Sequence, residues 1–369
     1  MADPRVEKLA DVLVNYSVAV KPGDKVFIEG GTLAEPLLKA VLVKVLQAGG
    51  HPLTLSSLPG MNELVYRYSS DEQLQHVPEA IKLILETYDV SIGIMAAANT
   101  KALSGIDPAK MVLRNQAETE LMKIFMRRAA SGELRWVGTQ FPTNATAQDA
   151  EMSLGDYEDF VYGACMPDMD DPVGYWKRFS DWQQKIVDWF KGKEKVRVVG
   201  PDTDLRLSVA GRTFINSNGK NNMPSGEVFT GPVEDSAEGH VYFSYPAIHQ
   251  GREVEGVRLW FEQGKVVKAT AEKNEEFLLQ TIDTDKGSRY LGEFAIGTNK
   301  GITRFTKSIL FDEKISGSFH LALGAGYPET GSKNESAIHW DMICDLRSGG
   351  EIWVDDQLLY KNGQFVIEF

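Results

Sequence analysis

A histidine and an aspartate stand one residue apart near the end of the printed chain, in the stretch AIHWDMICD from Ala337 to Asp345. Apolar and polar side chains alternate through this stretch, which predicts a β-strand. Because alternate side chains of a strand share a face, His339 and Asp341 point the same way, opposite to Trp340 and its apolar neighbours. The pair therefore presents an imidazole and a carboxylate to one point in space.

Three further segments place one ionisable side chain among small or apolar residues. GSFHLALGAGYP contains His320 in a strand-like run, NNMPSGEVFTGP contains Glu227 after a turn, and RYLGEFAIGTN contains Glu293 between a glycine and a phenylalanine. Burying such a carboxylate costs free energy unless a cation or a metal ion pairs with it. These segments therefore supply candidate partners for the pair near the end of the chain.

Each candidate also has a simpler explanation when taken alone. Glu227 is explained by a turn, Glu293 by an ion pair with Arg289 or Arg304, His320 by a place in the core, and the His-x-Asp pair by a structural hydrogen bond. Taken together, two glutamates, two histidines and one aspartate are better explained by one metal site than by a separate structural reason for each of the five residues. Their oxygen and nitrogen donors suit Zn²⁺, Co²⁺ or Mn²⁺, with Mg²⁺ also kept open.

The charges of this set favour two ions over one. Three carboxylates and one bridging hydroxide carry four negative charges, which two divalent cations balance. A neutral cluster is far less costly to bury than any of its members alone. Paired divalent ions of this kind clamp the attacking and leaving atoms in hydrolysis.

The segments that carry these residues resemble the M29 family of metallo-aminopeptidases, the group of aminopeptidase T, aminopeptidase S and PepS. The similar stretches are NMPSGEVFTGPVEDSAEG, LGEFAIGTNKGI, ILFDEKISGSFHLALGAGYPETG and SAIHWDM, and LADVLVNYSVAVKPGDKVFIEGG extends the resemblance to almost the whole chain. The resemblance implies a dinuclear site in the C-terminal domain, with these ligands: Glu227, Glu293, His320, His339 and Asp341. It also implies that Tyr327 of GAGYP lies beside the metals, and that the protein is a homodimer.

The function that the resemblance implies is removal of N-terminal residues from short peptides with a free N-terminus. In this mechanism Tyr327 donates a hydrogen bond to the tetrahedral oxyanion. Glu227 or Glu293 bridges the ions or acts as general base, and the sequence does not separate these roles. Two rival functions stay open: a metal-dependent amidohydrolase acting on a non-peptide amide, and a non-enzymatic ligand-binding protein with a structural metal site.

Two patterns of apolar and polar residues predict the helices and strands that must position these residues. In the first half, short apolar runs alternate with helical patterns, which predicts a mostly parallel sheet flanked by helices. The predicted strands are 25–31, 51–58, 89–96 and 134–142, and the predicted helices are 34–50, 70–88 with Ser70 or Asp71 as N-cap, 117–132 and 175–190.

After Gly192 the pattern changes to alternation with period two. The stretches 195–217 and 256–273 show it, as antiparallel strands do. We therefore predict an N-terminal α/β domain at 1–192 and a C-terminal α+β domain at 193–369, which has largely antiparallel strands and carries the metal site.

Composition narrows the function classes. The 369 residues include 39 basic and 52 acidic side chains, a net charge of −13 that argues against sequence-independent nucleic-acid binding. Cys165 and Cys344 are too few for a disulfide framework or a cysteine-rich zinc site. The absence of a signal-peptide pattern and of about 18 consecutive apolar residues predicts a cytoplasmic protein without a membrane span.

Three well-known catalytic or nucleotide-binding motifs are absent. EGGTLAEP follows a predicted strand but is not G-x-G-x-x-G, and GYPETGSK lacks the Gly-Lys-Ser/Thr end of a P-loop. No G-x-S-x-G nucleophile elbow occurs. The carboxylate and histidine set is therefore the constellation on which the functional prediction depends.

Overall fold

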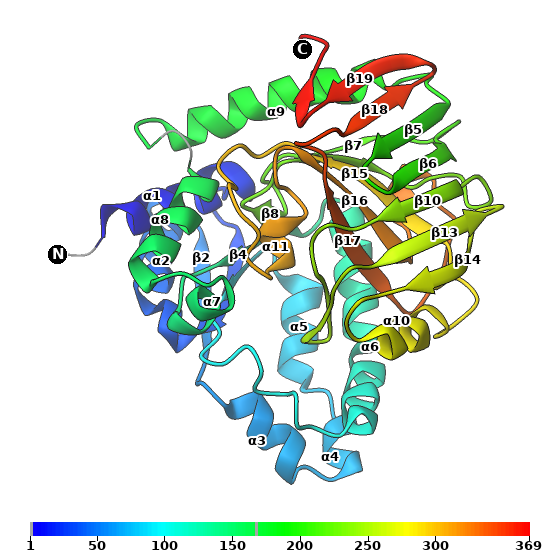
Figure 1. Ribbon diagram of the computed structural model, residues 1–369. Coiled ribbons are helices and arrows are strands. Elements are labelled where there is room, and N and C mark those ends of the chain that lie inside the picture. The colour runs from blue at the N-terminus through cyan, green and yellow to red at the C-terminus, as the bar shows by residue number, and fades with distance from the viewer. Residues whose placement is uncertain (1–2, 167–168) are drawn as a thin grey trace. The chain divides into compact units, whose positions relative to one another are not determined.

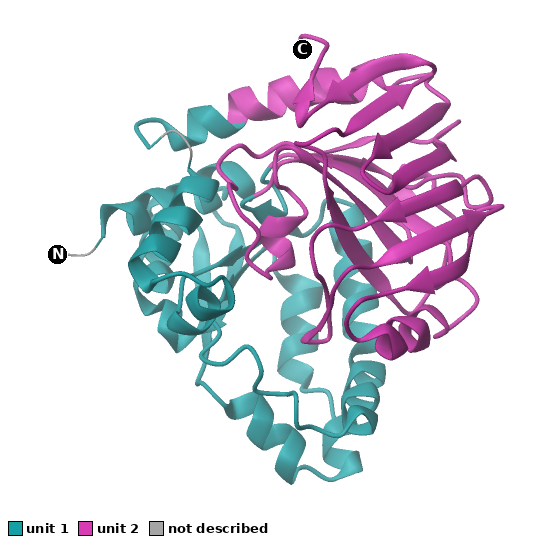
Figure 2. Cartoon of the chain, in the orientation of Figure 1, with its two compact units in different colours: residues 1–176, 219–224 teal, residues 177–218, 225–369 magenta. Residues whose placement is uncertain are grey.

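The computed structural model describes residues 3–166 and 169–369, which form two compact units (Figures 1 and 2). Unit 1 comprises residues 1–176 and 219–224, and unit 2 comprises residues 177–218 and 225–369. Helix α9, Pro172–Trp189, belongs to unit 2 from Lys177 onward.

Unit 1 is built on a parallel five-stranded sheet in the order β2-β1-β3-β4-β8. Its strands are β1 Lys25–Gly31, β2 His51–Ser57, β3 Val90–Met95, β4 Arg135–Gln140 and β8 Asn222–Met223. The four predicted strands thus lie within two residues of their observed ends. This sheet with its helices confirms the α/β prediction for the first half of the chain.

The helices of unit 1 differ in how much of their surface they bury, and those at residues 61–68 and 79–87 have no buried residue. Helix α2 buries a stripe that includes Leu37, Val41 and Val45, as expected for an amphipathic helix that covers a sheet. The helical elements are α1 Pro4–Asp11, η1 Val12–Ser17, η2 Thr32–Ala34, α2 Glu35–Gln47, α3 Met61–Tyr68, α4 Asp71–Gln75, α5 Glu79–Thr87, α6 Pro108–Ala130, α7 Asn144–Asp149 and α8 Leu154–Cys165.

The predicted helix 70–88 is two helices, α4 and α5. Ser70 is the N-cap of α4 and forms a capping box with Gln73, as one of the two predicted caps. The helix then ends at Gln75, because Pro78 has no N–H and forces the preceding residue out of the α conformation. The prediction of one continuous helix was therefore wrong at this proline.

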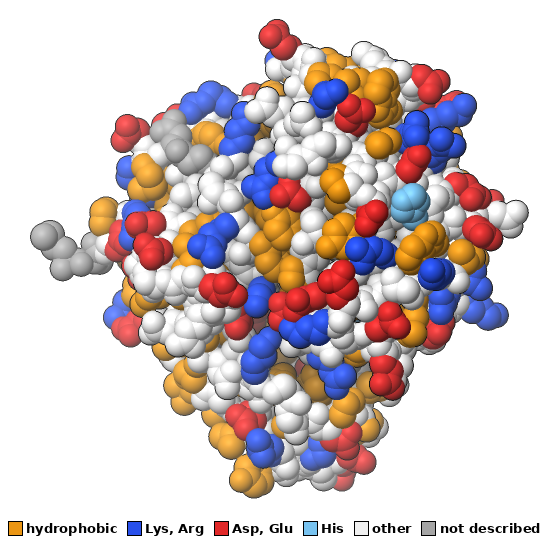
Figure 3. Space-filling model, viewed as in Figure 1, with side chains coloured by type: hydrophobic (Ala, Val, Ile, Leu, Met, Phe, Trp, Pro, Cys, Tyr) orange, Lys and Arg blue, Asp and Glu red, His pale blue; other side chains and the backbone are white. Residues whose placement is uncertain are grey.

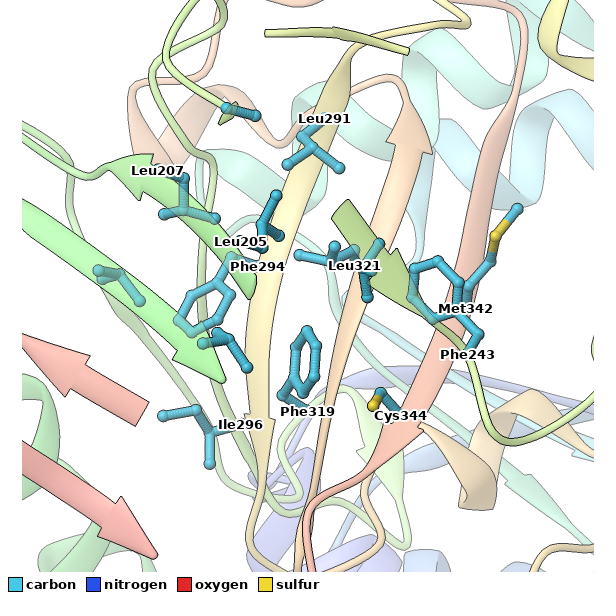
Figure 4. Close-up of a cluster of buried hydrophobic side chains, with 14 of the residues drawn as sticks. Leu205, Leu207, Phe243, Leu291, Phe294, Ile296, Phe319, Leu321, Met342 and Cys344 are labelled. Atoms are coloured by element: carbon cyan, nitrogen blue, oxygen red, sulfur yellow. The ribbon is translucent and has the colours of Figure 1, made fainter. Parts of the chain in front are cut away.

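Unit 2 is a sandwich of an eight-stranded and a five-stranded sheet. The first has the order β14-β13-β10-β6-β5-β18-β19-β20 and the second β17-β16-β15-β9-β7, and all their pairings are antiparallel. Apolar side chains from both sheets share one core, part of which Figure 4 shows around Phe294, Phe319 and Leu205. The antiparallel prediction for the second half is confirmed.

The bounds of the elements in unit 2 are as follows. Its strands are β5 Lys195–Gly200, β6 Thr203–Ser208, β7 Ile215–Ser217, β9 Glu227–Thr230, β10 Glu238–Tyr242, β11 Ala247–His249, β12 Arg252–Val254, β13 Arg258–Glu262, β14 Lys265–Thr270, β15 Leu291–Gly297, β16 Ser318–Gly324, β17 His339–Asp345, β18 Glu351–Val354, β19 Gln357–Lys361 and β20 Gln364–Phe365. Its helical elements besides α9 are α10 Glu275–Ile282, α11 Ile309–Asp312 and η3 Pro328–Thr330.

One short segment of the second half of the chain lies in unit 1. Residues 219–224 carry strand β8, which pairs in parallel with β4 through Gly138 and Thr139. The domain limits predicted from the sequence, with a boundary at 192, stay a prediction, because a compact unit and a domain that folds alone are different properties.

The surface charges, the two cysteines and the helices of the structure can each be compared with the composition. Figure 3 shows acidic and basic side chains interspersed over the visible face. Cys165 and Cys344 are both buried free thiols. Over residues 3–166 and 169–369, the helices include none that combines the length and the apolar character needed to cross a bilayer.

Candidate metal centre

The five candidate ligands lie on the five-stranded sheet of unit 2, and their positions follow from strand register. Glu227 begins β9, Glu293 lies on β15, His320 on β16, and His339 and Asp341 on β17. In this sheet Glu293 pairs with Ala322, and Ala322 pairs in turn with Asp341. Glu293 and Asp341 thus both face the small Ala322 on the strand between them, which leaves room between their side chains, while His320 faces Ala295 on β15 and Ile343 on β17.

The opposite face of the same strands packs into the sandwich core. Trp340 and Met342 alternate with His339 and Asp341 and are almost fully buried, as predicted for this strand. Phe294 and Phe319 do the same on β15 and β16. The alternation of strand side chains therefore separates an apolar core face from an ionisable face.

A β-bulge places Glu293 on the ionisable face. Leu291 and Glu293 are two residues apart and would share a face in a regular strand, but the pairing shifts between them. Leu291 consequently points into the core while Glu293 points away from it. Gly292 permits the bulge, since a Cβ atom there would lie 2.2 Å from the carbonyl oxygen of Ala325.

Glu293 lies between two groups of donors. Its Oε1 is 3.3 Å from Nε2 of His320, and its Oε2 is 3.5 Å from Nε2 of His339. On the first side Nε2 of His320 also lies 3.5 Å from Oε2 of Glu227. On the second side Nε2 of His339 lies 3.4 Å from Oδ1 of Asp341. The structure thus brings all five predicted ligands together.

The orientation of His339 is fixed by the backbone. Its Nδ1 donates to the carbonyl oxygen of Ala325 at 2.7 Å, so its Nε2 faces the carboxylates. A backbone partner on the second ring nitrogen is the usual way to orient a histidine ligand.

Burial and ionic pairing act in opposite directions on the ionisable groups of the cluster. Burial opposes ionisation of Asp341, yet the neighbouring His339 holds its pKa at about 2. Burial also opposes charge on the histidines, but the carboxylates raise the pKa of His320 to about 9. Burial raises the pKa of Glu227, and it raises the pKa of the Tyr327 hydroxyl together with nearby carboxylates.

Two charged residues that the sequence reasoning did not select belong to the cluster. Glu313 forms a third group with His320 and Asp341, in which one donor atom of each lies within 4.8 Å of the others. Lys314 is fully buried, and its Nζ lies 3.7 Å from Oε1 of Glu227 and pairs with the Glu313 carboxylate. The run of three charged residues from Asp312 to Lys314, between Phe311 and Ile315, is the sequence signal for them.

Tyr327 lies at the edge of the cluster. Its ring centroid is 5.2 Å from that of His339 and 5.5 Å from that of Phe229. Because burial and the carboxylates Glu293 and Asp341 raise its pKa, the hydroxyl keeps its proton and remains a donor.

The donor set fits divalent metal ions. Oε2 of Glu227, Oδ1 of Asp341 and Nδ1 of His320 are buried side-chain atoms without a hydrogen-bond partner among the residues that the structure describes. Such atoms are costly in a folded protein unless an ion or another partner satisfies them. Within the described part of the chain, every such group of three ionisable donors draws on these residues of unit 2.

Comparisons with known proteins extend over almost the whole chain. The sequence matches the family described as thermophilic metalloprotease (M29) over residues 2–365. Aminopeptidase 2 of Geobacillus stearothermophilus is 26% identical over 94% of both chains, and aminopeptidase T of Thermus thermophilus is 24% identical over 97% of this chain and 95% of its own.

Two solved structures share the fold. Wild-type AmpT from Thermus thermophilus superposes with a TM-score of 0.86 at 22% identity, over 99% of both chains. A 2,5-dihydroxypyridine dioxygenase from Pseudomonas putida has a TM-score of 0.60 at 14% identity, over 98% of this chain and 96% of its own. Because proteins named for different reactions share this fold, the function must be argued from the site.

Proposed function

The chain belongs to the M29 family of metalloproteases, and from this premise we propose that the cluster on β9, β15, β16 and β17 is the two-metal centre of an aminopeptidase. The enzyme is a metal-dependent aminopeptidase, in keeping with the names of its relatives. The observation that carries the two-metal proposal is the position of Glu293, whose two oxygens face two separate histidines.

The residues divide naturally between two ions. Glu227 and His320 would hold one ion, His339 and Asp341 the other, and Glu293 would bridge them. Of the two glutamates predicted to bridge, Glu293 is favoured because Oε1 of Glu227 faces Lys314 instead. Divalent ions in such a site lower the pKa of a water molecule and polarise the scissile carbonyl. Zn²⁺, Co²⁺, Mn²⁺ and Mg²⁺ are the ions proposed.

The protein side chains supply the remaining steps. A carboxylate of the cluster accepts the proton of the attacking water and returns it to the leaving amine. The protonated hydroxyl of Tyr327 donates to the oxyanion of the tetrahedral intermediate. The proposed substrates are short peptides with a free N-terminus, and the family resemblance further implies a homodimer, for which the molar mass in solution is the test.

Metal removal tests the proposal directly. Stripping the protein with a chelator should abolish release of N-terminal amino acids from a dipeptide, and adding Zn²⁺ or Co²⁺ should restore it. Two ions per chain should be found by elemental analysis of the reloaded enzyme. Full activity of protein shown to be metal-free would overturn the mechanism.

A matched pair of histidine substitutions tests the ligand assignment. His339→Ala should lose bound metal and activity together, since its Nε2 faces Glu293 and Asp341. His249→Ala is the control, because that half-buried ring lies 5.1 Å from the Trp340 ring but in none of the donor groups. Normal metal content in the His339 variant would remove it from the ligand set.

Substrates with free and blocked amines distinguish the remaining alternatives. An aminopeptidase should cleave amino-acid amides and p-nitroanilides only when the α-amine is free. Equal turnover of acetylated substrates would favour an amidohydrolase. Metal-loaded protein that turns over neither would favour a structural metal site.

A further inference from the structure

The ammonium of Lys314 is completely buried among the carboxylates of the cluster. It pairs with Glu313 and lies 3.7 Å from Oε1 of Glu227, and its side chain is 0% exposed. A buried ammonium that pairs with one carboxylate and faces a second is stabilised as a cation by their negative charges. These contacts place a cation inside the site, and Lys314 is not one of the proposed metal ligands.

The backbone around Lys314 is fixed on both sides. The Lys314 N–H donates to the carbonyl of Phe311 at 3.0 Å, and its carbonyl accepts from the Asn299 N–H at 3.0 Å. Asp312, the last residue of α11, accepts from the backbone N–H and the hydroxyl of Thr306. The loop therefore holds the lysine in one place before any ligand binds.

A glycine opens the space into which this loop fits. Gly297 pairs directly with Glu227 across β15 and β9. A Cβ atom at Gly297 would lie 2.2 Å from the carbonyl oxygen of Ile315 and 3.0 Å from the carbonyl carbon of Lys314. The missing side chain at the partner of Glu227 thus allows Lys314 to approach that carboxylate.

We propose that Lys314 is a positioning residue whose fixed charge balances a fourth carboxylate, Glu313, in the two-metal centre; this inference rests on the proposed function. When all four carboxyl groups are ionised, as metal binding requires, they carry four negative charges, and Lys314 reduces the total to three. Two divalent cations and one hydroxide together carry a net charge of +3, which neutralises the remaining three negative charges. Without Lys314 the same cluster would keep one uncompensated negative charge in a buried position, which proteins avoid.

A charge-balance role makes a prediction that a packing role does not. Removing a cation beside the site lowers the repulsion felt by an incoming divalent ion, so Lys314→Met should bind metal more tightly. Removing the negative charge of Glu313 at the same time should cancel this gain. A lysine that merely fills space would lower stability in both backgrounds and leave the metal affinity unchanged.

The experiment is a Co²⁺ titration of chelator-stripped protein, followed by visible absorption. We expect Lys314→Met to bind Co²⁺ about tenfold more tightly than the wild type, which corresponds to about 1.4 kcal/mol. Glu313→Gln/Lys314→Met should return to within about threefold of the wild type. Lys307→Met is the control, because Lys307 pairs with Glu253 outside the cluster and its loss should leave the affinity unchanged.

Each outcome decides the proposal. Unchanged or weaker Co²⁺ binding by Lys314→Met overturns it, as does equal tightening by Lys307→Met. If Lys314→Met alone does not fold, the double variant carries the test: a folded double variant with wild-type affinity supports charge balance, and an unfolded one overturns it.

Failure of this inference and failure of the proposed function give different results. If the wild type releases no amino acids while Lys314→Met still tightens Co²⁺ binding, the proposed function fails and the role of Lys314 stands. If the wild type cleaves dipeptides and the variants show no change in affinity, the role of Lys314 fails alone.

Discussion

At the scale of single residues, the hydroxyl of Tyr327 carries the most direct prediction about catalysis. Tyr327→Phe keeps the ring contacts with His339 and Phe229 but removes the donor. We expect kcat to fall by about 100-fold, the usual cost of losing one oxyanion donor, with metal content unchanged. Steady-state kinetics and elemental analysis measure both quantities.

Tyr245→Phe is the matched control for this substitution. Tyr245 is a partly buried tyrosine of the same unit whose hydroxyl lies 3.3 Å from Oδ2 of Asp345, a carboxylate that is in none of the donor groups. Its removal should leave kcat within about twofold of the wild type. Equal losses in both variants would show that Tyr327 acts through stability and not as a donor.

The residues of the cluster were predictable to the extent that strand alternation exposes them. His339 and Asp341 stand at alternate positions of a strand whose other face is Trp340 and Met342, so their shared direction follows from the sequence. Glu313 was not predictable in this way. It follows the short helix α11, and no periodicity shows where a residue at such a turn will point.

Glu293 illustrates the same limit within a strand. Regular alternation would place it on the face of Leu291, in the core. The bulge at Gly292 reverses this, and it depends on the close approach of residues 324 and 325 from another strand end. Local sequence does not contain that tertiary contact.

At the scale of elements, Gly297 is the position where strand β15 meets the loop that carries Glu313 and Lys314. Gly297→Ala should destabilise unit 2 by about 1–3 kcal/mol, the usual cost of overpacking, because the new methyl group meets backbone atoms that cannot rotate away. It should also weaken Co²⁺ binding by displacing the loop. Urea unfolding and metal titration measure the two effects.

Gly93→Ala is the control for this change. Gly93 also lies in a strand, β3, but the nearest atom to a new Cβ would be a glutamate side-chain oxygen at 3.8 Å, which is an ordinary contact. The control should therefore change the free energy of unfolding by less than about 1 kcal/mol. A Gly297 variant with the stability and metal affinity of the wild type would contradict the account of this loop.

Asp285 fixes the segment that leads into β17. Its carboxylate accepts from the N–H groups of Gly287, Ser288 and Ala337 and from the hydroxyl of Ser336. The slight desolvation of this exposed carboxyl group opposes ionisation, but the hydrogen bonds from Ala337 and its neighbours hold the pKa of Asp285 below 3.8. The carboxylate thus helps to set where His339 begins the strand.

Asp285→Ala should cost about 1–2 kcal/mol of stability near neutral pH, since water partly replaces hydrogen bonds to an exposed carboxylate. A carboxyl group with a depressed folded-state pKa stabilises the fold above its unfolded pKa and loses that effect as pH falls. The difference between wild type and variant should therefore be constant above about pH 4 and shrink below 3.8. Urea unfolding at a series of pH values measures it.

Asp283→Ala serves as the comparison for Asp285. Asp283 is a neighbouring exposed carboxylate whose main partner is Arg289 at 2.6 Å. An exposed ion pair contributes about 0–1 kcal/mol, so this variant should lose less stability. A pH-independent difference for Asp285→Ala would show that its charge is not what fixes the segment.

At the scale of the whole molecule, the two hydrophobicity patterns of the sequence correspond to two kinds of sheet. Apolar runs between helices gave the parallel sheet of unit 1, and period-two alternation gave the sandwich of unit 2. Strand β8 could not be predicted, because its two residues show no pattern and pair with β4 across about 80 positions of sequence. Contacts of such separation depend on the assembled fold.

The division of the chain into units predicts which strands metal binding stabilises. The candidate ligands lie on β9, β15, β16 and β17, all in unit 2. A ligand at about 1,000 times its Kd stabilises the state that binds it by about 4 kcal/mol. Because unit 2 has its own apolar core, this free energy should appear first as slower opening of the four strands.

Hydrogen exchange with and without metal measures this effect along the chain. Adding Zn²⁺ to stripped protein should slow amide exchange in peptides from β9 and from β15 to β17. Peptides from β1 and α2 of unit 1 are the internal reference, and their exchange should not change. A uniform slowing over both units would mean that the chain opens as one cooperative body. Slowing confined to unit 1 would contradict the proposed site, because the proposed ligands lie on paired strands of unit 2.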